Sequence, residues 1–244
     1  MDAITVNDLH KTFRLSHERY GSLKSLMLSF RKRTYDYVHA LKGISFEVTE
    51  GETLAIVGKN GSGKSTLLSI MARVYKPTSG TVVMNGRVSG LLALGAGFHT
   101  GLTGIENIYL NGSILGLSRR EITKRLDNIV SFAELEDFID APLRTYSSGM
   151  VMRLGFSVAI QVDPDILLVD EVLAVGDEQF QRKCYDHVRA MQSAGKTIVF
   201  VSHDLKAVRD VATRAIWLDS GEIRADDGVH SALDAYLAQS EGRP

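Results

Sequence analysis

The sequence predicts a layered α/β fold, in which helices cover a parallel sheet, and three observations support this. Short apolar runs alternate along the chain with longer amphipathic segments, which is the pattern of strands and helices in such folds. Three of the runs, at residues 54–57, 166–169 and 198–201, are apolar at every position. Continuous apolar strands are expected where helices cover both faces of a sheet. The chain has 244 residues, which is long enough for one large domain of this kind or at most two small ones.

Local signals place the other elements. A hydroxyl residue stands three positions before a glutamate at Thr103 and again at Ser118, which is the pattern of a capping box at the start of a helix. A helical region is therefore expected between the first and second core strands. Two opening strands, a late hairpin and a closing helix are expected at residues 4–9, 44–48, 215–223 and 230–237.

Apolar residues recur at helical spacing between the two opening strands, and basic residues flank them. Two interpretations stay open: a basic amphipathic helix that lies at a membrane surface or against a partner, and a solvated helix that lies on its own domain. The residues concerned are Leu23, Lys24, Leu26, Met27, Phe30, Arg31, Lys32 and Arg33.

Composition and charge exclude several classes of protein. The formal net charge is −1, so the charge of the whole domain does not favour nucleic acid or a membrane surface. No apolar run approaches the roughly 20 residues of a membrane span. The N-terminus lacks the basic segment followed by an apolar segment that is typical of a secretory signal. The single cysteine, Cys184, cannot form an internal disulfide, which suits a reducing compartment such as the cytosol. Any membrane spanning is therefore expected from a partner.

Residues 58–65 read Gly-Lys-Asn-Gly-Ser-Gly-Lys-Ser, a complete phosphate-loop motif that follows a core strand and precedes an apolar-periodic helix. Glycines let a tight loop turn its backbone N–H groups toward phosphate oxygens, and the positive end of the helix adds to the attraction. We expect Lys64 to bind the outer phosphates of a nucleotide and the Ser65 hydroxyl to ligate Mg²⁺. The residues expected to bind the nucleotide are Gly58, Asn60, Gly61, Ser62, Gly63, Lys64, Ser65 and Thr66.

Acidic and imidazole side chains follow the other two core strands. Asp170 and Glu171 come at the carboxyl end of one strand, where ligands bind in α/β sheets. We expect Asp170 to hold Mg²⁺, directly or through water, and Glu171 to polarise the attacking water. His203 follows the next strand through Ser202, where its ring can reach a terminal phosphate oxygen. The set predicts hydrolysis of a nucleoside triphosphate.

These motifs, together with Tyr146-Ser147-Ser148-Gly149-Met150 before the acidic pair, resemble those of the ABC ATPases. The resemblance implies a P-loop NTPase core with an antiparallel β portion. It also implies a helical subdomain at about residues 90–160 that carries the signature, within one nucleotide-binding domain of residues 1–244. In a homodimer, Ser147, Ser148 and Gly149 of one chain would face the ATP held by the other. Asp177 stands where the family has the aspartate of a loop that crosses the interface.

The wording of the motifs narrows the resemblance to the ATPase subunits of polysaccharide exporters. Residues 91–108, 146–150 and 171–177 carry it. Such subunits serve export of O-antigen, capsule or teichoic acid. The resemblance implies two copies of a separate multi-span membrane subunit, a glycan substrate reached through it, no nucleic-acid partner, and a place at the cytoplasmic face of the cell membrane. Because the sequence stops at Pro244, it resembles the shorter class without a C-terminal carbohydrate-binding domain.

Two positions depart from the general family pattern. The glutamine that usually contacts the γ-phosphate is missing, and its place falls near Leu94. The aromatic platform for adenine is ambiguous, because Phe13, Tyr35 and Tyr37 are all candidates; we favour Tyr37, although each ring could equally be a packing residue.

Docking of the membrane subunit is expected on the loop at 91–101 and the helical region at 104–133, with a buried turn as the alternative for the loop. The nearest rival function is an ABC subunit for lipids, drugs or nutrients. ABC ATPases that act on nucleic acid carry a long coiled coil between phosphate loop and signature, and the interval of 64–146 is too short for one. A small-molecule kinase with a phosphate loop would have neither the signature nor the histidine.

Overall fold

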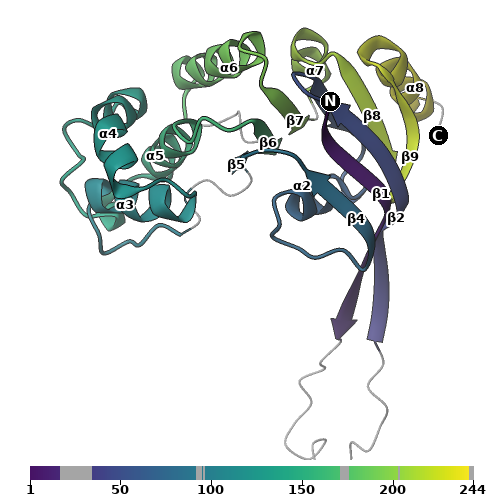
Figure 1. The fold of residues 1–244 in the computed structure, drawn as a ribbon, viewed down its shortest axis with the longest axis horizontal. Coiled ribbons are helices and arrows are strands. Elements are labelled where there is room, and N and C mark those ends of the chain that lie inside the picture. Colours follow the sequence, from purple (N-terminus) through teal and green to yellow (C-terminus); the bar gives the residue numbers. More distant parts are fainter. Residues whose placement is uncertain (17–34, 92–94, 96, 171–175, 203, 242–244) are drawn as a thin grey trace, which may run out of the picture.

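An α/β lobe and a helical lobe lie side by side in the molecule (Figure 1). The computed structural model describes residues 1–16, 35–91, 95, 97–170, 176–202 and 204–241. Within them, the predicted fold class is confirmed: a mostly parallel sheet, an antiparallel sheet and a helical subdomain. Among the helices that the structure describes, none has both the length and the apolar character needed to cross a bilayer.

A six-stranded sheet forms the centre of the α/β lobe. Its strand order is β5-β6-β7-β3-β8-β9, with β9 antiparallel to β8 and the other pairs parallel. The three predicted core strands are confirmed as β3, β6 and β7, and they lie next to one another. The predicted late hairpin is confirmed as β8 and β9. The bounds are Thr53–Val57 for β3, Val88–Leu91 for β5, Ile166–Asp170 for β6, Thr197–Val201 for β7, Arg214–Asp219 for β8 and Glu222–Gly228 for β9.

Residues of β3 contribute alternately to two hydrophobic cores, which explains why this strand is apolar at every position. Leu54 and Ile56 belong to the core between the two sheets, which α2 (Lys64–Met71) completes. Ala55 and Val57 belong to the core on the opposite face, under the remaining helices of the lobe. Those helices are α6 (Glu178–Ser193), α7 (Leu205–Val211) and α8 (Val229–Glu241).

The antiparallel sheet has the order β2-β1-β4, with bounds Tyr35–Thr49, Asp2–Ser16 and Ser79–Met84. The expected opening strands at residues 4–9 and 44–48 were too short. Both strands run on as a two-stranded ribbon beyond the body of the molecule (Figure 1). The ribbon is held by pairing as far as Ser16 with Tyr35, and the Arg14 guanidinium lies 3.4 Å from the centre of the Tyr35 ring. Residues 17–34 are outside the described residues, so the amphipathic helix stays a prediction.

The helical lobe has its own hydrophobic core, formed by α3 (Gly104–Ile114), α4 (Arg119–Ala133) and α5 (Ser148–Ile160). Both predicted capping boxes are confirmed: Thr103 accepts from the Glu106 N–H and Ser118 accepts from that of Glu121. The hydrogen bonds from Ser118 also hold the pKa of Glu121 below its ordinary value. The lobe joins the sheet through β5 on one side and through α5 and β6 on the other.

Candidate functional site

The loop from Gly58 to Gly63 connects β3 to α2 and can be built only with glycine at its two ends. Gly58 has φ +152°, and a Cβ there would collide with the carbonyl oxygen of Leu218. Gly63 has φ +108°, and a Cβ there would come within 2.5 Å of the Ala40 carbonyl oxygen. These contacts hold the loop between β2 and β8, with its backbone free of side chains at both ends.

The N-terminus of α2 differs from those of the next five helices in the way its backbone N–H groups are satisfied. Gly63 is the N-cap of α2, makes no side-chain cap, and is followed by no acidic residue in the first turn. In α3, α4, α5, α6 and α7, by contrast, a side chain accepts a backbone N–H at the helix start. Uncapped N–H groups with the positive end of the helix dipole form a binding site for phosphate.

Two buried polar side chains in the loop fit a triphosphate. Lys64 is only 6% exposed, and its Nζ donates to the carbonyl oxygens of Gly58 (2.7 Å) and Lys59 (3.0 Å). Phosphate oxygens can replace these carbonyls as stronger, charged acceptors. The Ser62 hydroxyl is buried and has no hydrogen-bond partner among the described residues. A ligand in the loop would offer that hydroxyl an acceptor. Asn60 and Gly61 form the exposed rim of the loop, Ser65 is exposed, and Thr66 is half-buried.

The carboxyl ends of β3, β6 and β7 meet at one edge of the sheet because the three strands are parallel neighbours. Asp170 is the last residue of β6, pairs with Val201 of β7, and is the one residue of its strand that is not buried. Glu171 and His203 fall outside the described residues, so their roles stay predictions. The strand ends that precede them lie at the predicted edge, next to the phosphate loop.

The expected Mg²⁺ site has a suitable donor set. Ser65 is the exposed second residue of α2, which packs on β6 and begins at the same edge of the sheet where Asp170 ends its strand. Both are oxygen donors, and Mg²⁺ is usually held by one or two such protein groups together with substrate phosphates and waters. Ser65 and Asp170 would therefore suit a Mg²⁺ ion as its protein ligands.

The signature segment begins α5. Ser147 is the N-cap: its Oγ accepts from the Met150 N–H at 3.2 Å. The side chains of Ser147 and Ser148 are exposed, and Gly149 is half-buried. A serine hydroxyl that accepts one hydrogen bond still has its proton to donate, so a capping Ser147 can also bind an anion. Tyr146 anchors the segment, since its buried hydroxyl donates to the Phe138 carbonyl at 2.7 Å.

Asp177 begins α6 in the same manner and has a second partner. One carboxylate oxygen accepts from the Phe180 N–H at 2.9 Å, and the other accepts from Arg153 of α5 at 2.6 Å. The hydrogen bond from Phe180, and then the charge of Arg153, hold the pKa of Asp177 below its ordinary value. Sequence reasoning missed Arg153, because nothing in the local pattern of α5 shows which distant carboxylate it reaches.

The three candidate aromatic platforms have different surroundings. Phe13 packs edge-on against Tyr75, with ring centres 5.4 Å apart, and Tyr35 lies under Arg14. Tyr37 is 60% exposed. It stands three residues before Ala40, whose carbonyl lies against the phosphate loop. At about 3.3 Å per residue along a strand, this places Tyr37 roughly 10 Å from the loop.

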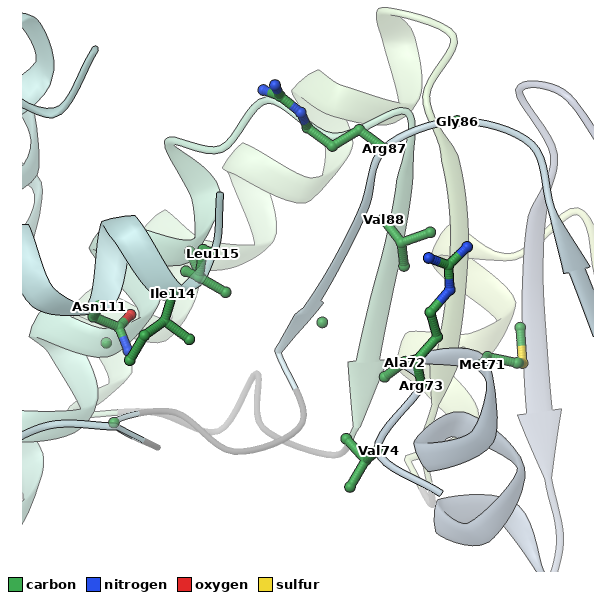
Figure 2. A pocket seen from close by; sticks show the side chains of 14 residues that line it. Met71, Ala72, Arg73, Val74, Gly86, Arg87, Val88, Asn111, Ile114 and Leu115 are labelled. Atoms are coloured by element: carbon green, nitrogen blue, oxygen red, sulfur yellow. The ribbon is translucent and has the colours of Figure 1, made fainter. Parts of the chain in front are cut away.

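A groove of about 530 Å³ lies between the two lobes. The end of α2 lies on one side and the end of α3 on the other, with Val88 of β5 between them (Figure 2). Sequence reasoning expected docking on residues 91–101 and 104–133, and Gly95 and the end of α3 do line the groove. Sequence reasoning did not single out the end of α2, which also lines the groove, because exposed apolar residues after a helix give no signal of their own. The main lining residues are Ala72, Arg73, Val74, Val88, Asn111, Ile114 and Leu115.

Comparisons with known proteins agree with this geometry. The sequence profile described as ABC transporter matches residues 41–174. The O-antigen export system ATP-binding protein RfbB of Klebsiella pneumoniae is 44% identical over 238 residues, which are 96% of this chain and 96% of that protein. A protein of the same name from Myxococcus xanthus is 48% identical over 92% of this chain, which spans only 53% of its length. A solved dimeric bacterial ABC transporter cassette matches with a TM-score of 0.72 at 25% identity, over 93% of this chain and 98% of that one. The chain therefore belongs to the ABC transporter family, as an ATP-binding and ATP-hydrolysing subunit.

Proposed function

We propose that the chain forms a homodimer that hydrolyses ATP with Mg²⁺ to power the export of a polysaccharide or lipid-linked glycan through a separate membrane-spanning subunit. The observation that carries this is the match along 96% of both chains to an O-antigen export ATP-binding protein, combined with a helix α2 whose uncapped N-terminus follows a glycine-built phosphate loop. The chain would act at the cytoplasmic face of the cell membrane, bound there by its partner.

Each residue of the site has a distinct part in the reaction. The backbone N–H groups of the loop and Lys64 bind the phosphates, and Tyr37 stacks on the base. Bound Mg²⁺ would neutralise charge on the phosphate oxygens, held by Ser65 and Asp170. Glu171 orients and polarises the attacking water, and His203 contacts the terminal phosphate. Phosphoryl transfer needs little covalent chemistry from the protein, so positioning and charge provide most of the rate.

Two copies related by a two-fold axis would bury two ATP molecules between the phosphate loop of one and the α5 N-terminus of the other. The exposure of Ser147 and Ser148, on a helix whose dipole attracts anions, supports this arrangement. Loss of the γ-phosphate removes a ligand shared by the two chains. The dimer then opens, and whatever is docked on the lobes moves with it.

The groove between the lobes is the proposed docking place of the membrane subunit. Each side of the groove carries an exposed apolar side chain, since Ile114 at the end of α3 is 60% exposed and Val74 after α2 is 66% exposed. Arg73 and Arg87 add positive charge at the same groove (Figure 2). A partner segment with an apolar residue and an acidic one would fit both. Because the groove lies between the lobes, it would follow any change in their relative position.

Changing Ile114 to aspartate is expected to reduce recovery of the membrane subunit by at least about tenfold, since a charge would be buried in an apolar contact. The measurement is affinity purification of the tagged native chain from detergent-solubilised membranes, followed by identification of the co-purifying multi-span protein. ATPase activity of the isolated chain should stay within about twofold, because an exposed substitution costs little stability.

Phe138→Asp is the matched control. Phe138 is 51% exposed on the same lobe but does not line the groove. Its variant should recover the multi-span protein as the unaltered chain does. If no multi-span protein of a glycan export system co-purifies with the unaltered chain, the export proposal is wrong; equal recovery with Ile114→Asp contradicts the docking place alone.

A further inference from the structure

We infer that Arg153 is a positioning residue for the active site of the opposite chain, because it joins the two helix starts that one chain presents to its partner. These are the start of α5, with Ser147, and the start of α6, with Asp177. The inference rests on the proposed shared site of the homodimer. The Arg153 side chain is 19% exposed, and the chemistry described above assigns it no part.

The contacts of Arg153 span both lobes. One nitrogen of its guanidinium donates to Asp177 at 2.6 Å and another donates to Glu134 at 3.0 Å. Glu134 is the C-cap of α4, with φ +56° and ψ +49°, and its other oxygen accepts from Lys183 of α6 at 3.1 Å. The arginine fork therefore holds the end of α4 and the start of α6 at once, from a side chain on α5.

Packing fixes the guanidinium in this position. It lies over the Phe180 ring, 5.0 Å from its centre. A Cβ on Gly176 would come within 3.2 Å of the Arg153 Nε, so the backbone just before Asp177 runs against the side chain. Below it, Phe180 of α6 packs edge-on against Phe132 of α4 and Phe156 of α5, with centres 5.7 and 6.2 Å apart. The Arg153 guanidinium thus packs on a cluster of aromatic rings that connects the two lobes.

This arrangement gives Arg153 an effect at a distance. Asp177 ends the segment that follows Asp170 and Glu171, and Ser147 lies on the helix that carries Arg153. A shift of either helix start is transmitted to the other through the arginine. Small misplacement of positioning groups is costly in catalysis, up to about a hundredfold for an ångström. Removal of Arg153 should therefore damage the site completed by the altered chain, and spare the site formed by its own phosphate loop.

Hybrid dimers that carry the same two substitutions in two arrangements test this directly. The substitutions are Arg153→Met, which keeps the length of the side chain, and Lys64→Ala, which disables one phosphate loop. In the split arrangement they lie on different chains, so the working loop is completed by an intact Arg153. In the joined arrangement both substitutions lie on one chain, so the working loop of the other chain is completed by the chain that carries Arg153→Met. Differential affinity tags isolate each hybrid, and single-turnover cleavage of ATP is measured.

The split hybrid is expected to match a Lys64→Ala hybrid with an unaltered chain within about twofold, and the joined hybrid to fall at least about tenfold below it. Equal rates for the two arrangements overturn the inference, since a general structural role would act alike in both. Ser147→Arg in the same two arrangements tests the shared site separately. If the two arrangements of Ser147→Arg also have equal rates, the proposed dimer site is wrong. If the rates differ for Ser147→Arg but not for Arg153→Met, only the role of Arg153 is wrong.

Amide hydrogen exchange tests the inference without a measurement of turnover, so it applies even if the reference hybrid is inactive. In the isolated chain, Arg153→Met should speed exchange at the start of α6, residues 177–182, at least about tenfold. Lys183→Met is the matched control: it breaks the other contact to Glu134 but leaves the pair of Arg153 and Asp177. Unchanged exchange with Arg153→Met, or equal change with Lys183→Met, contradicts the inference. If the methionine variant fails to fold, Arg153→Lys keeps the charge without the fork and takes its place.

Discussion

Glu171→Gln is expected to lower ATP turnover by at least about a hundredfold, the usual contribution of a general base, while ATP still binds. The residue follows Asp170, which β6 delivers to the edge of the sheet beside the phosphate loop. Glutamine keeps the size of the side chain but cannot accept a proton from the attacking water. ATP that is bound and not cleaved should hold two chains together, so the variant should run as a dimer on a sizing column with ATP and Mg²⁺.

Glu178→Gln is the matched control for that prediction. Glu178 lies in the first turn of α6, is largely exposed, and pairs with Arg182 on its own helix. Loss of such a surface pair changes stability by less than about 1 kcal/mol, and turnover should not change. Phosphate release by Glu171→Gln at the rate of the unaltered chain would show that another group activates the water.

Local physics explains which parts of the fold could be predicted. Each capping box is made within four residues, so Thr103 and Ser118 could be recognised without knowledge of the tertiary structure. The core strands were recognisable because both of their faces are buried, as β3 shows. The phosphate loop follows from its glycines, which relieve contacts that any side chain would make. In each of these features, residues close together in the sequence determine the local structure.

The outer halves of β1 and β2 could not be predicted, because their residues are mostly polar and at least partly exposed, and their strand form depends on pairing with each other. Thr12 pairs with His39 and Arg14 pairs with Tyr37. The segment between the two strands is too long for the sequence to show which residues pair. β4 was missed for a similar reason, since most of its residues are at least partly exposed.

Long-range contacts set the limit for the site. Arg153 and Asp177 are 24 residues apart in the sequence, and only the packing of α5 against α6 brings them together. The sequence favoured Tyr37 as the adenine platform but could not show the contact of Ala40 with Gly63 or the partners of Phe13 and Tyr35. The motifs thus predicted which residues take part in binding and catalysis. The structure adds which of these residues contact one another within one chain.

Ser147→Arg is expected to reduce turnover of the homodimer by about a hundredfold, as loss of a positioned donor to a developing anion does, with ATP binding by the isolated chain unchanged. Ser147 caps α5 and is exposed, far along the chain from the phosphate loop. Arginine removes the hydroxyl and places a long side chain in the interface. Equimolar mixing with Lys64→Ala should restore at most one working site for each dimer, measured as phosphate release after co-refolding or co-expression.

Ser118→Arg separates the anion contact from helix capping. Ser118 also caps a helix of the helical lobe, α4, by accepting a backbone N–H three residues on, is exposed, and in addition donates to the Glu121 carboxylate. Both variants lose an N-cap worth about 1 kcal/mol of stability, so Ser118→Arg should lower the thermal unfolding temperature at least as much as Ser147→Arg does. Only Ser147→Arg should lose turnover, because only α5 is expected to meet a phosphate held by another chain. A Ser147→Arg chain that stays monomeric and hydrolyses ATP at the full rate would mean that each chain encloses its own nucleotide, and the shared site would have to be abandoned.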